Sequence, residues 1–225
     1  MSRFLLLCFL PLFLIADTWE EYKQKVLLFQ KAVPGWCTEE KASQMMDLIY
    51  EIKPQVCVEI GVFGGSSAYP TAAALKFMKS GLLFGIDPWS AAASTDGYSA
   101  DDANYQWWSQ IDYNKIYMNY LNLIRTQQLE PFCATYRMSS LDAIVFFQDE
   151  SIDILHIDGN HSEESALRDA VLYFPKVKMG GYIWFDDVNW NTTAQAVSYL
   201  LTRCNLLLDR SIGNECFLFQ KSAAD

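Results

Sequence analysis

Apolar and polar positions alternate along the chain in blocks that predict helices and strands in turn. Residues 38–52 have the spacing of an amphipathic helix, with Thr38 as its cap and Pro54 just beyond its end. The short apolar run 56–60 stops at a glycine-rich turn and has the length and β-branching of a buried strand. Further strands are predicted at 82–86, 132–136, 152–157, 182–185, 206–209 and 215–219, and further helices at 67–79, 114–125, 162–174 and 192–203.

This order of elements predicts an α/β fold in which helices cover both faces of a mainly parallel, seven-stranded sheet. The last two strands, around Gly213-Asn214, are expected to form a C-terminal antiparallel hairpin. The expected architecture is Rossmann-like and doubly wound, and such sheets bind ligands at the carboxyl ends of their strands. The polar residues that follow the predicted strands are Glu59, Asp87, Ser139, Asp158, Asp186 and Asp187.

The first sixteen residues have a different pattern from the rest of the chain. Arg3 is followed by an unbroken apolar run, residues 4–15, and then by Ala16. This order is typical of a signal peptide, and the run is too short for an ordinary membrane-spanning helix. We therefore expect residues 1–16 to be a signal peptide or an N-terminal anchor, with membrane contact only through this segment if it is not cleaved. Residues 17–225 are expected to form one domain.

One long stretch, residues 90–128, contains many hydroxylated and indole rings. Such side chains suit a lid over an organic ligand, because one end of each ring is apolar and the other is polar. A helical subdomain packed on the edge of the sheet is an equally weighted alternative. The aromatic residues in question are Tyr98, Tyr105, Trp107, Trp108, Tyr113, Tyr117 and Tyr120.

Composition and charge narrow the range of partners. The 225 residues carry 17 Lys and Arg against 27 Asp and Glu, for a net charge of −10, and no cluster of cations suits a nucleic acid. The five cysteines beyond residue 16 have irregular spacings without a C-x-x-C pair, so neither a disulfide framework nor a zinc site is expected. This cysteine usage is typical of the cytoplasm, whereas the leader favours export or membrane association, and the sequence leaves the location open.

The glycine-rich turn runs from Glu59 to Ser67, as Glu-Ile-Gly-Val-Phe-Gly-Gly-Ser-Ser. It lacks the G-x-G-x-x-G spacing of dinucleotide folds and the G-K-[ST] ending of a P-loop. Its glycines allow a ligand to approach the backbone, and the carboxylate of Glu59 would repel a pyrophosphate but suits a cationic ligand. Asp87 follows the next strand and can accept both hydroxyls of a ribose, with capping of the following turn as the alternative.

Together these residues resemble the class I S-adenosylmethionine-dependent methyltransferases. The metal-dependent small-molecule O-methyltransferase group, which includes catechol, macrolide-sugar and cephalosporin-type enzymes, is the most similar. Residues 156–162, His-Ile-Asp-Gly-Asn-His-Ser, resemble the I-D-G-x-H-x segment of that group, and residues 180–188 resemble its G-G-x-I-x-x-D-D segment. The resemblance covers about residues 36–219, so residues 17–225 are expected to be a methyltransferase domain.

The resemblance implies a cofactor site for S-adenosylmethionine. Trp36 would help to cover it. The residues that would form it are Glu59 and Gly61 at the methionine and ribose end, Gly65 in the same turn, Ser67 at the carboxylate, Asp87 at the ribose hydroxyls, Ser139 near the adenine, and Asp158.

The resemblance also implies a metal site and a general base. Asp158, Asp186 and Asp187 would bind one divalent cation, and His161 would accept the proton of the acceptor. Carboxylates at the ends of neighbouring strands repel one another without a cation, and oxygen ligands favour Mg²⁺, with Mn²⁺ or Ca²⁺ as alternatives. Each motif alone also has a structural reading, since the two adjacent aspartates could start a loop and His161 could cap a helix. His156 is expected in the core, without a catalytic role.

The expected function is methyl transfer to a hydroxyl of a small organic acceptor. The main alternative is a non-catalytic methyltransferase-like binding protein, exported or membrane-associated, because the cofactor is made in the cytosol. An α/β enzyme for nucleotide sugars is less favoured, since the chain lacks cations placed to bind phosphates. The acceptor itself and a homo-oligomeric state are left open.

Overall fold

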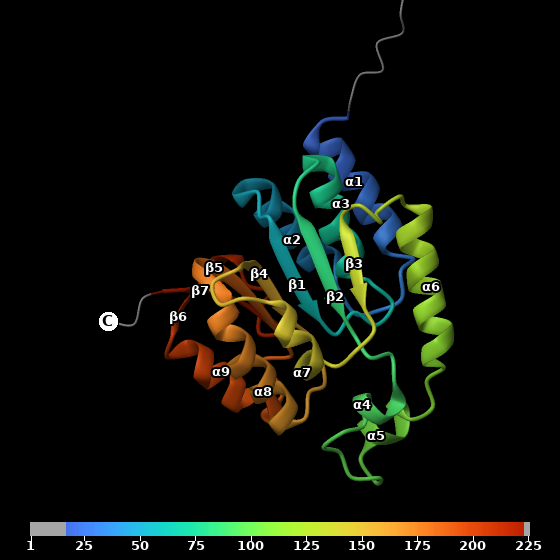
Figure 1. The fold of residues 1–225 in the computed structure, drawn as a ribbon, viewed down its shortest axis with the longest axis vertical. Coiled ribbons are helices and arrows are strands. Elements are labelled where there is room, and N and C mark those ends of the chain that lie inside the picture. Colours follow the sequence, from blue (N-terminus) through green and yellow to red (C-terminus); the bar gives the residue numbers. More distant parts are fainter. Residues whose placement is uncertain (1–16, 223–225) are drawn as a thin grey trace, which may run out of the picture.

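A computed structural model describes residues 17–222, and the leader predicted at residues 1–16 lies outside them. One seven-stranded sheet forms its centre (Figure 1). The strands are β1 (Val56–Ile60), β2 (Leu82–Ile86), β3 (Cys133–Tyr136), β4 (Ile152–Ile157), β5 (Val177–Asp186), β6 (Cys204–Leu206) and β7 (Cys216–Lys221).

The sheet has the order β3-β2-β1-β4-β5-β7-β6. The five strands β1 to β5 are parallel, and β7 runs antiparallel between β5 and β6. The predicted fold class is therefore confirmed. The strand order reverses between β1 and β4, so the carboxyl ends of these two strands lie side by side at the switch point where such sheets bind ligands.

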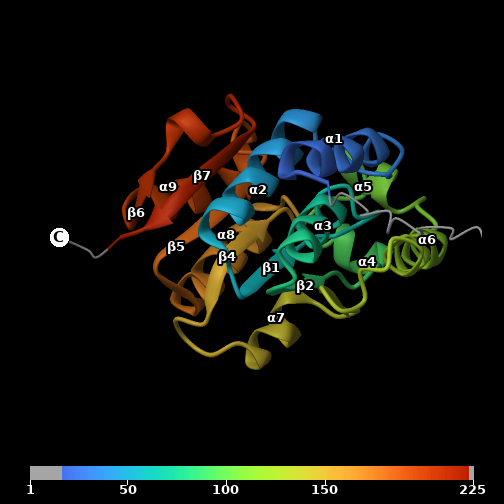
Figure 2. The ribbon, with the colours of Figure 1, turned by 90° about the horizontal axis from the view of Figure 1, so that it is seen from above.

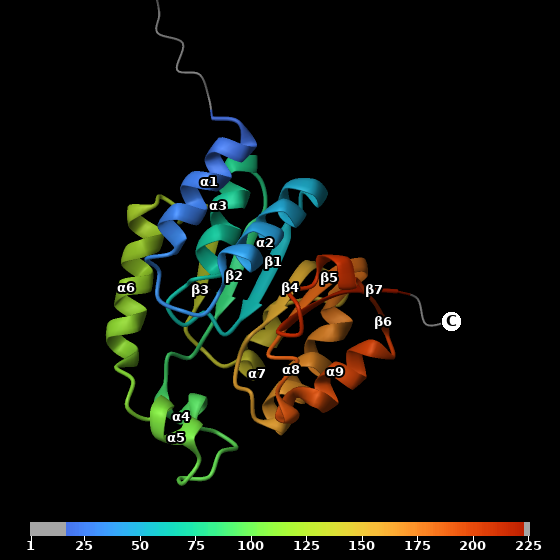
Figure 3. The ribbon, with the colours of Figure 1, turned by 180° about the vertical axis from the view of Figure 1, so that it is seen from behind.

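Helices cover both faces of the sheet, and Figures 1 and 3 view it from opposite sides. Each face has its own apolar core, and Figure 2 shows α1 and α7 on opposite sides of the sheet. None of the helices in residues 17–222 combines the length and the apolar character that a membrane crossing requires. One face carries α1 (Trp19–Gln30), α2 (Glu39–Ile52), α3 (Ala68–Met78) and α6 (Tyr113–Thr126), and the other carries α7 (Ser140–Ala143), α8 (Glu163–Tyr173) and α9 (Ala194–Leu201).

The aromatic stretch 90–128 divides into two parts. Its second part is α6, which lies beside the edge strand β3 and buries Tyr113 and Tyr120 in the core (Figure 1). Its first part holds the short helices α4 (Ala91–Ser94) and α5 (Ala103–Trp108), beyond the carboxyl ends of the strands. Helix α6 thus packs on the edge of the sheet, as the alternative of a helical subdomain expected. The role of the first part as a lid stays a prediction.

Several element boundaries differ from the prediction. Helix α1 was not predicted, although Thr18 and Glu21 form a capping box at its start. Strand β6 covers Cys204–Leu206 rather than 206–209, because a short strand at the sheet edge has too few residues to show an alternating pattern. Strand β5 begins at Val177, five residues earlier than predicted. The prediction missed these residues because Gly180 and Gly181 interrupt the apolar run.

Candidate active site

A cavity of about 480 Å³ lies at the carboxyl ends of the central strands. Its wall is formed by the turn after β1, the α4–α5 segment and the loops that follow β4 and β5. Arg168 is the one arginine among the described residues of this wall, which includes no lysine. The wall is therefore acidic and favours a positively charged ligand. Its five aspartates are Asp87, Asp96, Asp158, Asp169 and Asp187.

Asp87 holds the glycine-rich turn in place. Its Oδ2 accepts hydrogen bonds from the backbone N–H groups of Val62 (3.1 Å) and Phe63 (2.9 Å), and its Oδ1 accepts one from Trp89 N–H (2.6 Å). The indole of Trp89 donates to the carbonyl of Phe63 at 2.8 Å, and both residues have positive φ, +43° and +48°. Burial raises the pKa of Asp87, and these three N–H groups oppose that rise. Asp87 therefore supports the turn and also lines the cavity.

Gly61 and Gly65 have different neighbours in this turn. Gly61 has φ +86° and lies in the cavity wall, where a Cβ atom would overlap the carbonyl oxygen of Asp158. This close approach brings the end of β1 against the end of β4. Gly65, with φ +90°, faces the ring of Tyr120 on α6. Gly61 thus lines the cavity and its cofactor contact stays a prediction, whereas Gly65 permits the packing of α6.

Ser67 lies in the cavity wall at the start of α3, and Glu59 lies beneath it. The hydroxyl of Ser67 donates to Glu59 Oε1 at 2.6 Å. Glu59 is completely buried and faces a separate small cavity on the α2–α3 side of the sheet. A contact of Glu59 with a ligand in the large cavity therefore passes through Ser67.

Ser139 lines the far end of the cavity as the cap of α7. Its hydroxyl accepts a bond from the N–H of Asp142 at 3.1 Å and lies 2.6 Å from the carboxylate of that residue. The adjacent Ser140 donates to Asp169 Oδ1 at 2.6 Å. Burial raises the pKa of Asp169 to about 6, although Ser140 and Arg168 lower it. The sequence prediction missed Asp169, because it lies within a helix and not at the end of a strand.

The three predicted metal ligands lie in two groups that share Asp158. The ligand atoms of Asp158, His161 and Asp187 lie within 4.8 Å of one another, and so do those of His156, Asp158 and Asp186. Asp186 and Asp187 belong to different groups, since Asp187 has φ +54° and the chain turns there. The first group lines the large cavity, and the second is more deeply buried.

His161, the predicted base, lies between two carboxylates. Its Nε2 is 2.9 Å from Asp187 Oδ2 and 3.8 Å from Asp158 Oδ1, and its ring meets that of Trp190 edge-on at 4.9 Å. Burial lowers the pKa of His161, but the two carboxylates outweigh this effect and raise it to about 10. This raised pKa favours the positively charged imidazolium, with both ring nitrogens protonated, at neutral pH.

A lysine that the sequence prediction missed neutralises the deeper group. Lys41, in the first turn of α2, forms an ion pair with Asp186, and its Nζ lies 3.7 Å from Asp158 Oδ2. Burial opposes the charge of Lys41, yet the two carboxylates hold its pKa well above its usual value. The signal was present in the sequence, because Lys41 shares the apolar face of the predicted helix with Met45.

His156 is buried, as predicted, but its ring is not surrounded by apolar groups alone. Its Nε2 lies 2.9 Å from Asp186 Oδ2, and its Nδ1 lies 3.6 Å from Glu59 Oε2. Burial and Lys41 lower its pKa, while Asp186 and Glu59 raise it to about 9. The pKa of Asp158 is raised to about 6 by burial and by the charge of Asp186.

Aromatic rings form one side of the cavity mouth. Trp36 packs against Phe63, Trp107 and Trp108, with ring centroids 5.2 to 5.8 Å apart. All four line the cavity, and Trp36 is 65% exposed. Trp36 thus lines the cavity, and its role as a cover for the site stays a prediction.

A family model for the methyltransferase domain matches residues 58–188, which is more than half of the chain. The chain belongs to this methyltransferase family. The predicted resemblance to methyltransferases is thereby confirmed. The matched segment contains the glycine-rich turn, Asp87, His161 and the paired aspartates at the end of β5. No curated protein sequence matches the methyltransferase.

Solved structures have a similar fold along nearly the whole chain. The methyltransferase PaMTH1 from Podospora anserina, bound to SAH, is 12% identical over 90% of this chain and 88% of its own, with a TM-score of 0.63. An O-methyltransferase from Bacillus cereus in complex with SAH is 16% identical over 93% of each chain, with a TM-score of 0.59. The O-methyltransferase TomG from Streptomyces achromogenes, in complex with SAM, is 14% identical over 93% and 92%, with a TM-score of 0.60.

Proposed function

We propose that this methyltransferase takes its methyl group from S-adenosylmethionine and transfers it to a hydroxyl of a small organic acceptor. The observation that carries the proposal is one acidic cavity in which the glycine-rich turn, Asp87 and His161 face a common space. Two structures with the same fold are O-methyltransferases described in complex with SAH and SAM.

The cofactor would lie along the turn after β1. Asp87 would accept the ribose hydroxyls, and the support for this role is that Asp87 lines the cavity where the turn and β2 meet. Ser67 would face the methionine part, and Ser139 would face the adenine at the other end. The aspartates of the wall favour the positive charges of the sulfonium and the ammonium.

The reaction is a displacement at the methyl carbon. The acceptor oxygen forms a bond to that carbon, the bond to sulfur breaks, and its electron pair stays on sulfur. We propose that His161 receives the hydroxyl proton, which requires the imidazole to be neutral first. Trp36, Trp107 and Trp108 would hold the acceptor in line, and such positioning is most of what the protein must supply.

We also propose a divalent cation, with Mg²⁺ as the first choice, held by Asp158, Asp186 and Asp187. The donor set fits in part, because carboxylate oxygens are hard ligands and Asp158 and Asp187 belong to one group in the cavity wall. Asp186 belongs to the deeper group and would have to turn away from its present partners to join them. Lys41 competes for Asp186, whose carboxylate it already contacts. When bound, the cation supplies positive charge that opposes the carboxylates and makes both His161 and a nearby hydroxyl easier to deprotonate.

Calorimetric titration with S-adenosylhomocysteine (SAH) tests the cofactor proposal. We expect saturable heat with the wild-type chain and none with NAD. Asp87→Ala should weaken SAH binding by about 1–3 kcal/mol, because the cofactor hydroxyls and three backbone N–H groups lose their acceptor. Thermal unfolding of the variant controls for loss of fold. An absence of heat at millimolar SAH would refute the proposal.

A further inference from the structure

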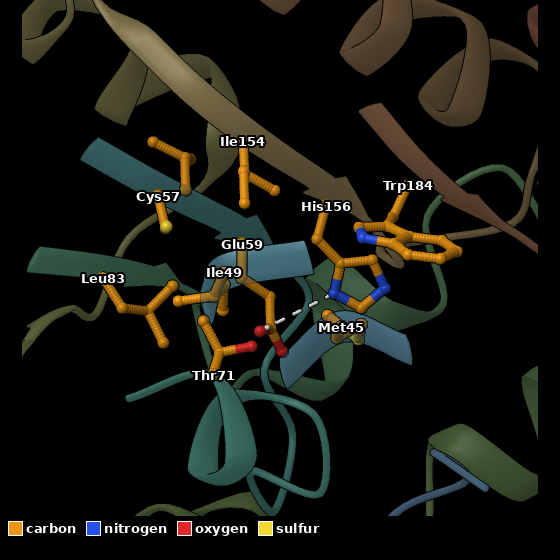
Figure 4. A pocket seen from close by; sticks show the side chains of 10 residues that line it. Met45, Ile49, Cys57, Glu59, Thr71, Leu83, Ile154, His156 and Trp184 are labelled. Carbon is orange, nitrogen blue, oxygen red and sulfur yellow. Dashed lines mark ion pairs between the residues drawn. The ribbon is translucent and has the colours of Figure 1, made fainter. Parts of the chain in front are cut away.

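A second, much smaller cavity lies beneath the cofactor site, on the α2–α3 side of β1. The space that it offers to the centre of a water molecule is about 10 Å³, close to the room that one water needs. Most of its wall is apolar and comes from α2 and the central strands, as Figure 4 shows. The polar exceptions are Glu59, Thr71 and His156.

Each of these three residues has a buried polar atom without a hydrogen-bond partner among the described residues. The atoms are Glu59 Oε2, Thr71 Oγ1 and His156 Nδ1. The distance of 3.6 Å from Nδ1 to Oε2 is slightly longer than a direct hydrogen bond, so a water lying beside the two atoms can complete the hydrogen bonding of both. Figure 4 shows the Glu59 carboxylate between Thr71 and His156. Three such atoms around one small space fit a water with three partners.

The other polar atoms of Glu59 and His156 already have partners. Glu59 Oε1 accepts the bond from Ser67, and His156 Nε2 lies 2.9 Å from Asp186, which is paired with Lys41. Buried polar groups connected in this way have few alternative arrangements, because each broken bond leaves an unpaired group.

We propose that this cavity holds one internal water, and that this water and His156 position Glu59 and thereby Ser67 for the cofactor. The proposal rests on the proposed use of S-adenosylmethionine. His156 touches neither reactant and is a positioning residue, which connects the cofactor end of the site with Asp186. Because Ser67 donates its hydroxyl proton to Glu59, its hydroxyl oxygen can only accept from a ligand in the cavity that Ser67 lines. It therefore suits the ammonium of the cofactor rather than the carboxylate that the resemblance implied.

Thr71→Val and Thr71→Ser form the matched test, because both fill the site on α3 but only serine keeps a hydroxyl. We expect Thr71→Val to weaken SAH binding roughly 5- to 20-fold in calorimetry, since the water and Glu59 lose a partner. Thr71→Ser should restore most of the affinity. His156→Gln keeps polar atoms near both neighbours and should weaken binding less than His156→Leu.

A crystal structure of the wild-type chain at high resolution completes the test by showing the cavity directly. Density for a water within hydrogen-bond distance of Glu59, Thr71 and His156, together with the affinity loss in Thr71→Val, supports the proposal. If wild type and Thr71→Val bind SAH equally, or if density for the water is missing, the proposal is overturned while the cofactor assignment stands. If the wild type binds no SAH, the proposed function and the positioning role both fail.

Discussion

Lys41 is a cation buried among carboxylates, with a side chain that is 7% exposed. Its positive charge balances the carboxylates of the more deeply buried group, Asp158 and Asp186. The same arrangement would make it a competitor for the proposed divalent cation, because both need the carboxylate of Asp186. The balance between them can be measured on the folded protein.

Replacing Lys41 by methionine should destabilise the protein by about 3–5 kcal/mol, because Asp186 loses a buried partner. Added Mg²⁺ should raise the melting temperature of Lys41→Met more than that of the wild type, since the competitor is gone. Lys23→Met is the matched control. Lys23 is similarly buried and pairs with Asp47 on the α1–α2 surface away from the cavity, so its loss should destabilise without a gain in the Mg²⁺ response. Equal Mg²⁺ responses of all three proteins would show that Lys41 does not compete.

Asp169 predicts a pH dependence of stability. Its pKa in the folded chain is raised to about 6 from 3.8, so the folded state binds this proton more tightly than the unfolded state does. Its contribution therefore becomes more favourable as pH falls from about 6 to 4, and is unfavourable above pH 6. Asp169→Asn keeps an acceptor for Ser140 and should stabilise the protein by about 1–3 kcal/mol at pH 7, with no gain near pH 4. Urea unfolding at both pH values would measure this, and an equal effect at the two would contradict it.

At the scale of elements, the contact between the ends of β1 and β4 depends on Gly61. Gly61→Ala should destabilise by about 2–5 kcal/mol, because it combines a left-handed backbone with an overlap on Asp158. Gly180→Ala is the control, since Gly180 also has positive φ, +76°, but has nothing within 4 Å of the new atom. The Gly180→Ala substitution should lower the free energy of unfolding by about 1–2 kcal/mol, from backbone strain alone. Similar urea midpoints for the two variants would show that the overlap is relieved.

The elements also show why the sequence predicted some parts of the site and missed others. Buried parallel strands are continuous apolar runs, so the central strands could be located and the residues at their ends, such as Asp87 and Asp158, could be assigned to one edge of the sheet. Lys41 and Asp169 come from helices, and their meeting with that edge depends on how α2 and α8 lie on the sheet. The separation of Asp186 from Asp187 depends on one positive φ angle, which no spacing predicts.

At the scale of the whole molecule, methyl transfer and cofactor binding should depend on opposite ends of the cavity, so that one can be lost without the other. His161→Ala should lower kcat by roughly 10²–10⁴, the usual contribution of a positioned base, and leave the calorimetric affinity for SAH nearly unchanged. Excess EDTA should likewise abolish methyl transfer while SAH binding survives, because the turn after β1 contains none of the proposed ligands. Full activity in EDTA would show that the aspartates after β4 and β5 act without a cation.

The acidic wall treats the two forms of the cofactor differently. The proposed donor carries a positive sulfonium, whereas the sulfur that remains after transfer is a neutral thioether. We therefore expect the wall's attraction for the sulfur centre to disappear when the methyl group is transferred, while the proposed contacts of Asp87 and Ser139 would be unchanged. On this proposal the cavity would bind the charged cofactor more tightly than its neutral product, so each methyl transfer would itself favour the release that the next turnover needs.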